Sequence, residues 1–323
     1  MNKKSTFLSI LSKYISLNFI EIGARGNVKD FKKFESIINY YGFEPDLSAF
    51  DKKHKLLSSI PFASINLFPE GLCTKLQSKN SNISLYLTKH EGCSSLLEPN
   101  FNLLDEYRGF RVGDPTRPFN ENFHIKKQVP IKAKEVDLFC INGIESSDII
   151  QIDIQGLEID ILSESKLIDS CTLVDIELEI LELYNNQKLL SEALDFFESK
   201  GFKLIRLFNQ GYAPRLPLSK YNFSDHGEII STDAIFVKYP TEKFDEIIKF
   251  SLIVYFYSFY SLSLYYLNKL DNTNLSEEQN RLVEMFKSHI YKSYRKHNLI
   301  GAFYLRIKLT INKIWFLLNR CLK

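Results

Sequence analysis

The sequence lacks the cysteine pattern of a zinc site or of a disulfide framework. Its five cysteines are scattered over 323 residues and form no C-x-x-C pair. A large excess of charge of one sign is also missing, since the formal net charge is only +2. The globular part has no basic patch interleaved with stacking aromatics, so no nucleic-acid partner is expected. A reducing compartment fits the cysteines best, and we expect a cytoplasmic protein.

The sequence does not begin like a signal peptide. The segment MNKKSTFLSILSKYISL places lysines before an apolar stretch, but Lys13 interrupts this stretch and no small-residue cleavage site follows. We therefore predict a short amphipathic helix over residues 1–17.

Long hydrophobic runs are scarce, but one uncharged stretch covers residues 250–267. Its 18 residues reach the length of a membrane span, although serines and tyrosines interrupt it. We favour a helix hairpin packed on the domain or on a second subunit of a homo-oligomer, with a membrane span as the alternative. Because the composition changes to long helical segments after Pro240, residues 241–323 are expected to form an α-helical C-terminal extension.

Basic residues are concentrated at the end of the chain. Residues 285–323 contain lysines and arginines and no acidic residue. As a helix, this region would place Arg306, Lys313 and Arg320 on one stripe. Such a helix could lie on an anionic membrane surface, which would put the protein at the inner membrane face, or near an anionic glycan. A helix docked on the core with solvated charges is the alternative.

Short apolar runs alternate with helical patterns over residues 18–240. NFIEIG is followed by the helix-like KDFKKFESIINY, then by the strand YGFEP and a helix from about Leu47. Further strands are predicted at DIIQIDI, TLVDIELEI, KLIRLF and DAIFVK. A helix is predicted between Leu190 and Phe202, with Gly201 at its C-cap. Residues 91–130 are expected to form a long functional loop or a partly disordered excursion. The pattern predicts a Rossmann-like α/β domain whose sheet carries helices on both faces.

A glycine motif follows the first predicted strand, in the segment Glu21-Ile22-Gly23-Ala24-Arg25-Gly26-Asn27. Glycines allow a tight turn and a close ligand approach, and the start of a following helix would present free N–H groups. A dinucleotide site prefers G-x-G-x-x-G, whereas the spacing here is G-x-x-G. Glu21 would repel a pyrophosphate but suits the cationic groups of S-adenosylmethionine. A purely structural turn is the alternative.

Two more acidic segments end predicted strands. Glu44, in Gly42-Phe43-Glu44-Pro45-Asp46, is placed to accept hydrogen bonds from both ribose hydroxyls, whereas Asp46 also suits a helix N-cap. Asp153 ends the strand at residues 148–154, and Glu158 opens the helix that follows. Together these segments predict adenosine binding beside a carboxylate-lined cleft. Tyr184 would either stack on a sugar ring or pack in the core.

The ordered set of motifs resembles the FkbM-type S-adenosylmethionine-dependent methyltransferases over about residues 18–238. The matching residues are Gly23 and Gly26 of the glycine motif; Phe43, Glu44 and Pro45 of F-E-P; Gly92, Ser94 and Ser95 of G-x-S-S; Asp153, Gly156 and Glu158 of D-x-x-G-x-E; and Glu177 with Gly201, Phe202 and Leu204 further on. Many relatives have Asp in place of Glu21 and other residues around Arg25.

The resemblance implies a class I methyltransferase fold, S-adenosylmethionine as the donor, and O-methylation, commonly of sugars in natural products or cell-surface glycans. The residues expected to bind the donor are Glu21, Gly23, Arg25, Gly26, Asn27, Glu44, Pro45, Asp46, Ser94 and Ser95. The residues expected to be catalytic are Asp153, Glu158 and Glu177. Asp153 would take the hydroxyl proton and Glu177 would orient the sugar, or the pair would hold a divalent metal ion.

Two other functions stay open from the sequence alone. A non-catalytic Rossmann-like module could bind an adenosine ligand, or serve assembly through its C-terminal helices. An oxidoreductase is disfavoured by the glycine spacing.

Overall fold

The computed structural model describes residues 3–79, 83–111, 114–135, 144–215, 227–272 and 274–296. The chain forms two compact units, one of residues 16–239 and the other of residues 1–15 with 240–323. Arg306, Lys313 and Arg320, on which the expected basic stripe depends, lie outside the described residues.

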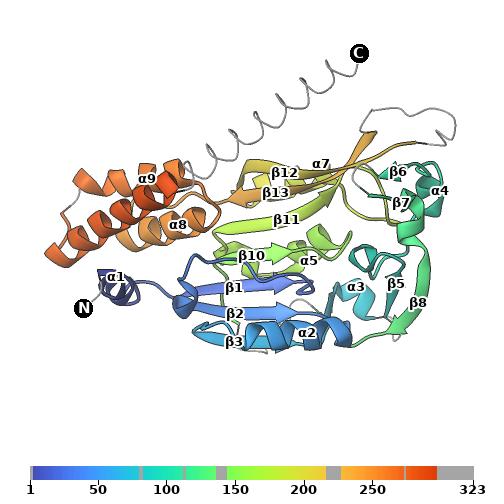
Figure 1. Cartoon of the computed structure of the whole chain (residues 1–323), viewed down its shortest axis with the longest axis horizontal. Helices are drawn as coiled ribbons and strands as arrows, with labels where there is room; N and C mark the ends of the chain where they lie inside the picture. The colour runs from blue at the N-terminus through green and yellow to red at the C-terminus, as the bar shows by residue number, and fades with distance from the viewer. Residues whose placement is uncertain are drawn as a thin grey trace, which may run out of the picture. The chain divides into compact units, whose positions relative to one another are not determined.

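The first unit is built on a seven-stranded sheet in the order β12-β13-β11-β10-β1-β2-β3 (Figure 1). The five strands from β11 to β3 are parallel, whereas β13 runs antiparallel to both of its neighbours. The strands are β1 (Leu17–Ile22), β2 (Ile38–Phe43), β3 (Ser64–Phe68), β10 (Ile149–Ile152), β11 (Leu173–Glu179), β12 (Lys203–Ala213) and β13 (Glu228–Val237). The predicted α/β sheet is thereby confirmed.

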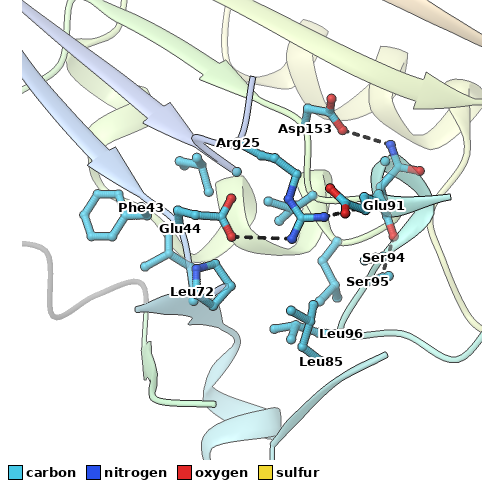
Figure 2. Close-up of a pocket in the computed structure, with 18 of the residues that line it drawn as sticks. Arg25, Phe43, Glu44, Leu72, Leu85, Glu91, Ser94, Ser95, Leu96 and Asp153 are labelled. Atoms are coloured by element: carbon cyan, nitrogen blue, oxygen red, sulfur yellow. Dashed lines mark hydrogen bonds and ion pairs between the residues drawn. The ribbon is translucent and has the colours of Figure 1, made fainter. Parts of the chain in front are cut away.

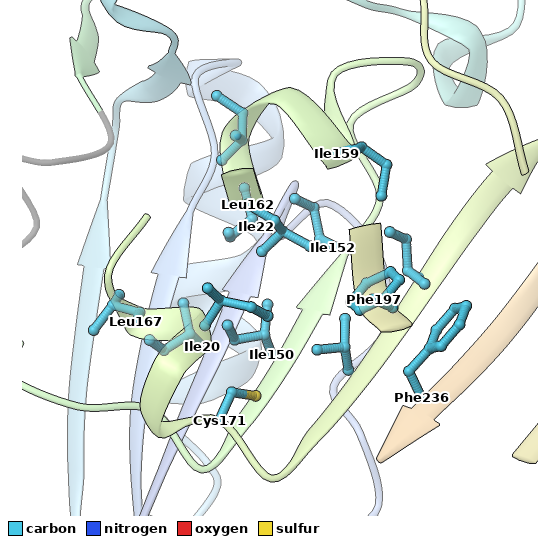
Figure 3. Close-up of a cluster of buried hydrophobic side chains, with 14 of the residues drawn as sticks. Ile20, Ile22, Ile150, Ile152, Ile159, Leu162, Leu167, Cys171, Phe197 and Phe236 are labelled. Atoms are coloured by element: carbon cyan, nitrogen blue, oxygen red, sulfur yellow. The ribbon is translucent and has the colours of Figure 1, made fainter. Parts of the chain in front are cut away.

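Alternation along the strands gives the sheet two different faces. Ile20 and Ile22 of β1 belong to a buried cluster with Ile150 and Ile152 of β10 and aromatic residues such as Phe197 (Figure 3). Helices α5 (Glu158–Glu164), α6 (Leu167–Ser170) and α7 (Leu190–Ser199) also contribute to this cluster, together with the neighbouring strands. Each fully buried side chain of this size stabilises the fold by about 1.5–3 kcal/mol.

The opposite face carries Phe19 and Glu21 of β1, since these residues alternate with Ile20 and Ile22. Helix α2 (Leu47–Leu57) covers this face, because its Lys53 reaches Glu21. Helices therefore lie on both faces of the sheet, as the sequence predicts. Gly201 follows α7 with a φ of 81°, which matches the predicted helix end.

The predicted helix over residues 29–40 is wrong. Lys32 and Lys33 have φ values of 57° and 74°, which interrupt a right-handed helix. Only a 3₁₀ turn, η1 (Glu35–Ile37), precedes β2. The irregular path lets Phe31 pack edge-on against Phe19, with ring centroids 5.0 Å apart. Burial of this aromatic side chain thus outweighs the local helical pattern.

The described residues between β3 and β10 contain more regular structure than the long loop predicted over residues 91–130. Pairs of short strands form three two-stranded sheets, β4 with β9, β5 with β8 and β6 with β7. The elements are β4 (Gly71–Cys73), α3 (Lys75–Ser78), β5 (Ser84–Thr88), η2 (Glu91–Cys93), α4 (Phe101–Leu104), β6 (Phe110–Arg111), β7 (Asp114–Pro118), η3 (Phe119–Phe123), β8 (Ile125–Pro130) and β9 (Ala133–Glu135). Tyr107 and Phe123 of this segment form a second buried cluster with Tyr184, which follows β11 in the sequence.

The second unit consists of helices from both ends of the described chain. They are α1 (Lys3–Leu11), α8 (Phe244–Phe256), α9 (Tyr260–Lys269), the 3₁₀ turn η5 (Leu270–Asn272) and a helix over residues 277–296. Phe7 of α1 lies 5.7 Å from Phe286 between ring centroids, and Phe250 lies 4.8 Å from Tyr266. The uncharged stretch at residues 250–267 is thus split between α8 and α9, which confirms a helix hairpin. Among the described residues, no helix has the length and apolar character needed to span a bilayer.

Candidate functional site

A cavity of about 250 Å³ opens at the carboxyl ends of β1, β2 and β10 (Figure 2). Several segments that are distant in the sequence line it together. They are residues 22–26 (without residue 24), 43–45, 70–72, 91–96 (without residue 93) and 153–157 (without residue 156), with Leu85. The carboxyl edge of a parallel sheet is where open α/β folds bind ligands.

Gly23 forms the tight turn after β1. Its φ is 82°, and an added Cβ would lie 2.0 Å from the carbonyl oxygen of Asp153, so no other residue fits here without a shift. The backbone N–H groups of Gly23 and Ala24 both donate to the Phe43 carbonyl, at 3.0 and 2.9 Å. No helix follows the turn, so the expected helix N-terminus with free N–H groups is not present in residues 24–34.

Arg25 ties three parts of the rim together. Its Nη2 lies 2.6 Å from Asp46 Oδ2 and 3.9 Å from Glu44 Oε1, while its Nη1 donates to the Glu91 carbonyl at 2.7 Å. Figure 2 shows the guanidinium extended between Glu44 and Glu91. The glycine turn, the end of β2 and η2 are therefore fixed relative to one another by one side chain.

Glu44 faces the cavity from the end of β2 and is only 3% exposed. Its Oε1 accepts a 2.8 Å hydrogen bond from the Asp46 backbone N–H. Burial raises the pKa of this carboxyl to about 7, against the effects of that hydrogen bond and of Arg25. Pro45 also lines the cavity, whereas Asp46 caps α2 through Ser48 N at 3.0 Å and does not line it.

Ser94 and Ser95 line the cavity from the other side. Ser94 Oγ accepts from the Thr88 backbone N–H at 3.2 Å, and Ser95 Oγ donates to the Gln155 carbonyl at 2.7 Å. The second contact joins the G-x-S-S segment directly to the turn after β10.

Asp153 reaches the cavity from the end of β10, and Glu177 of β11 lies beside it. The side-chain amide of Gln155 donates to Asp153 Oδ1 at 2.9 Å and to Glu177 Oε2 at 2.6 Å. Burial, followed by the negative charge of Asp153, raises the pKa of Glu177 to about 8. Glu177 does not line the cavity itself, so it reaches the ligand space only through Gln155.

Glu158 holds the backbone of the turn and does not line the cavity. Its two carboxylate oxygens accept from the Ile154 and Gly156 N–H groups at 2.8 and 2.9 Å. Burial raises its pKa to about 7. This placement corrects the expectation that Glu158 contacts the reacting groups, because its oxygens are used by the D-x-x-G turn.

Glu21 is turned away from the cavity, contrary to our expectation. It follows Ile20 on the strand and therefore points to the opposite face, where its Oε1 lies 2.8 Å from Lys53 Nζ. Tyr40 donates to its other oxygen at 2.5 Å. Burial raises the pKa of Glu21, while Lys53 opposes that rise. Asn27 is also outside the cavity, and its carbonyl lies 3.5 Å from the same Lys53 Nζ.

Tyr184 is fully buried and packs against Phe123, so the packing alternative holds for it. Its hydroxyl lies 3.0 Å from both the Cys93 carbonyl and Gln155 Oε1. Sequence reasoning also missed several lining residues, namely Glu70, Gly71, Leu72, Leu85, Glu91 and Leu96. The position of residues 70–72 just after β3 is the one signal that could have indicated them.

In the part of the chain that the structure describes, no cluster of three or more His, Cys, Asp or Glu side chains is arranged to hold a metal ion. The carboxylates of Asp153, Glu177 and Asp233 nevertheless occupy one row across β10, β11 and β13, since Glu177 pairs with Asp233 in register. Asp233 accepts from Asn209 Nδ2 at 2.6 Å, and burial raises its pKa to about 6. This side of the site is therefore acidic.

The strand order, the antiparallel β13 and a cavity at the carboxyl edge together define a class I methyltransferase fold. The Methyltransferase FkbM domain model matches residues 24–204, which is more than half of the chain. The chain belongs to this S-adenosylmethionine-dependent methyltransferase family, which confirms the resemblance drawn from the sequence motifs.

Several solved structures share a weak overall similarity with the chain. Magnesium protoporphyrin IX methyltransferase from Synechocystis PCC 6803, with bound SAM, is 7% identical, with 73% of this chain and 77% of that chain covered and a TM-score of 0.30. Precorrin-6y C5,15-methyltransferase from Geobacter metallireducens is 9% identical, with 74% and 90% covered and a TM-score of 0.29. TrmK of M. capricolum, in complex with S-adenosyl-homocysteine, is 9% identical, with 88% and 96% covered and a TM-score of 0.29. No curated protein matches the chain.

Proposed function

We propose that this protein transfers the methyl group of S-adenosylmethionine to a hydroxyl oxygen of a sugar, with the donor bound in the cavity at the carboxyl edge of the sheet. One observation carries the proposal. Four motif segments, at residues 23–26, 43–45, 92–95 and 153–156, are far apart in the sequence and each contributes lining residues to one cavity. A structural role for each segment alone would not require them to meet.

The lining residues fit the adenosyl donor. Apolar walls from Phe43, Leu72, Leu85 and Leu96 suit an adenine ring, and Glu44 stands at the end of β2 where it can accept hydrogen bonds from ribose hydroxyls. Gly23 leaves the close approach at the end of β1 free of a side chain.

The donor supplies an electrophilic methyl group on a sulfonium. The chain contributes mostly by binding and orientation, because holding an acceptor oxygen in line with the methyl group lowers the entropic part of the barrier. Asp153 is the carboxylate that reaches the cavity next to the turn, so it would accept the hydroxyl proton during transfer. A sugar acceptor rests on the family resemblance, and Asp153 is the member of the acidic row that lines the cavity and can accept a hydrogen bond from a hydroxyl.

Calorimetric titration with S-adenosylmethionine tests donor binding. We expect Glu44→Ala to weaken the affinity about ten- to a hundredfold, since a hydrogen bond to a charged group contributes about 1.5–3 kcal/mol. Glu121→Ala is a matched control, because Glu121 lies in the same unit and outside the cavity. Absence of donor binding to the intact wild-type fold would reject the enzyme in favour of a non-catalytic module.

Methyl transfer from labelled donor to nucleotide sugars and surface glycans tests the acceptor class. Asp153→Asn should lose turnover while donor affinity stays within a few fold, because proton removal affects only the transfer step. Near-normal turnover of this variant would dismiss Asp153 as the base. Labelling of a nitrogen or carbon acceptor in preference to a hydroxyl would contradict O-methylation.

A further inference from the structure

Gln155 makes more polar contacts at the cavity wall than any predicted catalytic residue. Its amide nitrogen donates to Asp153 and Glu177, its Oε1 lies 3.0 Å from the Tyr184 hydroxyl, and its carbonyl accepts from Ser95 Oγ. These partners come from β10, β11, the loop after β11 and the G-x-S-S segment. One residue therefore joins the two sides of the site, because its backbone carbonyl contacts the G-x-S-S segment and its side chain contacts Asp153 and Glu177.

The backbone at Gln155 is held in an unusual conformation. Its φ is 61°, a left-handed value that costs a residue other than glycine about 1–2 kcal/mol. Gly156 follows with a φ of 112°, and Glu158 fixes the turn through the N–H groups on either side of Gln155. Strain that the surroundings maintain at a cavity wall is a feature of functional sites. Here the left-handed turn directs the Gln155 side chain between two carboxylates.

We propose that Gln155 is a positioning residue of the methyl-transfer reaction, whose amide holds Asp153 and Glu177 in one orientation so that Asp153 receives the acceptor proton. This inference rests on the proposed function. The amide has two N–H groups, and each is used by one carboxylate. Because Gln155 occupies Asp153 Oδ1, the second oxygen, Oδ2, is the one that accepts the proton.

The bonds balance in this step. The acceptor oxygen forms a bond to the methyl carbon, while the sulfur–carbon bond breaks and its electron pair stays on sulfur. The acceptor proton moves to Asp153 Oδ2 and leaves to solvent after product release. The amide of Gln155 does not exchange a proton in this sequence, so its contribution is geometric.

Several acidic groups surround the pair and influence its titration. Asp233 of β13 and Glu158 of α5 raise the pKa of Glu177 by their negative charge, and Glu158 and Glu177 raise the pKa of the buried Glu179 of β11 in the same way. Glu21 of β1 lies within electrostatic range of Asp153, and the buried Tyr184 is hydrogen-bonded to Gln155. The two hydrogen bonds from Gln155 join Asp153 and Glu177 to each other within this group of acidic residues.

Gln155→Met tests the proposal, because methionine has a similar length and no hydrogen-bond donor. Gln128→Met, on the exposed face of β8, is the matched control. We expect Gln155→Met to bind S-adenosylmethionine within about threefold of wild type while kcat falls at least about tenfold, without a matching change in KM for the donor. Unchanged kcat would overturn the positioning role.

A second measurement does not depend on turnover. The carboxyl group of Glu177 can be followed by a ¹³C NMR titration without donor, with its signal assigned from the Glu177→Gln variant. The hydrogen bond from Gln155 stabilises the ionised form of Glu177, so its titration midpoint should move to higher pH when Gln155→Met removes that bond. An unmoved midpoint would overturn the arrangement even if the protein is a methyltransferase. A different outcome is that the wild-type protein fails to bind the donor while the Glu177 midpoint still moves in Gln155→Met. That result would refute the proposed function but would support the hydrogen bonds from Gln155 to Asp153 and Glu177. If Gln155→Met fails to fold, Gln155→Asn replaces it, because asparagine tolerates left-handed φ and its shorter side chain cannot reach both carboxylates.

Discussion

The buried pair of Lys53 and Glu21 allows one sharp test of the structure. Lys53 has no exposed side-chain surface and Glu21 has 4%, and Lys53 Nζ also contacts the Gly26 carbonyl at 3.0 Å. Lys53→Met would leave the Glu21 carboxylate buried without its cation. Breaking a buried ion pair in this way costs about 3–5 kcal/mol. For a unit of this size we expect Tm to fall by roughly 6–20 °C.

The double variant Glu21→Gln with Lys53→Met separates loss of an ion pair from loss of packing. It removes both charges and keeps an oxygen for the Tyr40 hydroxyl, so most of the lost free energy of unfolding should return. Urea unfolding followed by circular dichroism measures both variants. A cost below about 1 kcal/mol for Lys53→Met, or a double variant as unstable as the single one, would refute the buried pair.

The same double variant also tests whether Glu21 binds the donor. Because its carboxylate faces α2 and not the cavity, the double variant should keep donor affinity within about threefold of wild type, provided that it folds. A loss comparable to that of Glu44→Ala would restore Glu21 as a donor ligand.

Two further predictions concern backbone geometry and pH. Gly23→Ala should lower the unfolding free energy by at least about 2 kcal/mol, because Gly23 has a φ of 82° and an added Cβ would clash with Asp153. An added Cβ at Gly26 meets no atom within 4 Å, so Gly26→Ala should cost less than about 1 kcal/mol. Equal costs for the two variants would contradict the tight turn at Gly23. Glu177 has a folded pKa of about 8, above its ordinary value of 4.5, so its stabilising contribution is complete below about pH 4.5 and is lost as pH rises to about 8. The contribution of Glu177 to the unfolding free energy should therefore fall over this range by up to about 1.4 kcal/mol per pH unit, and Glu177→Gln should reduce the pH dependence by that amount. A wild-type protein that is equally stable at pH 5 and pH 8 would contradict the buried acid.

Sequence periodicity predicted the sheet well and the connections poorly. The segments at 148–154 and 172–180 are rich in isoleucine and bounded by polar residues, a composition that favours buried strands. The helix predicted over residues 29–40 failed because long-range burial of Phe31 against Phe19 is invisible in a local pattern. The described residues between β3 and β10 fold through pairings between short strands, which local propensity cannot indicate.

The sequence predicted which residues meet at the candidate site better than it predicted the directions of their side chains. The strand ends placed Gly23, Glu44 and Asp153 at one edge, because the carboxyl ends of parallel strands meet there. The direction of Glu21 could also have been predicted, since it alternates with the core residues of its strand. Gln155 was missed because its importance depends on a left-handed backbone and on Glu177 from another strand.

Helix α1 pairs with helices that are synthesised much later. Lys13, just after α1, forms an ion pair with Glu278, 265 residues further along the chain. At about 5–20 residues per second, the ribosome needs on the order of 10–60 s to complete that interval. Phe7 and Leu11, which are buried in the finished unit, therefore lack their native neighbours while the sheet is being made. The helical unit can assemble only after the methyltransferase domain has been translated, so its packing is a late event in biogenesis.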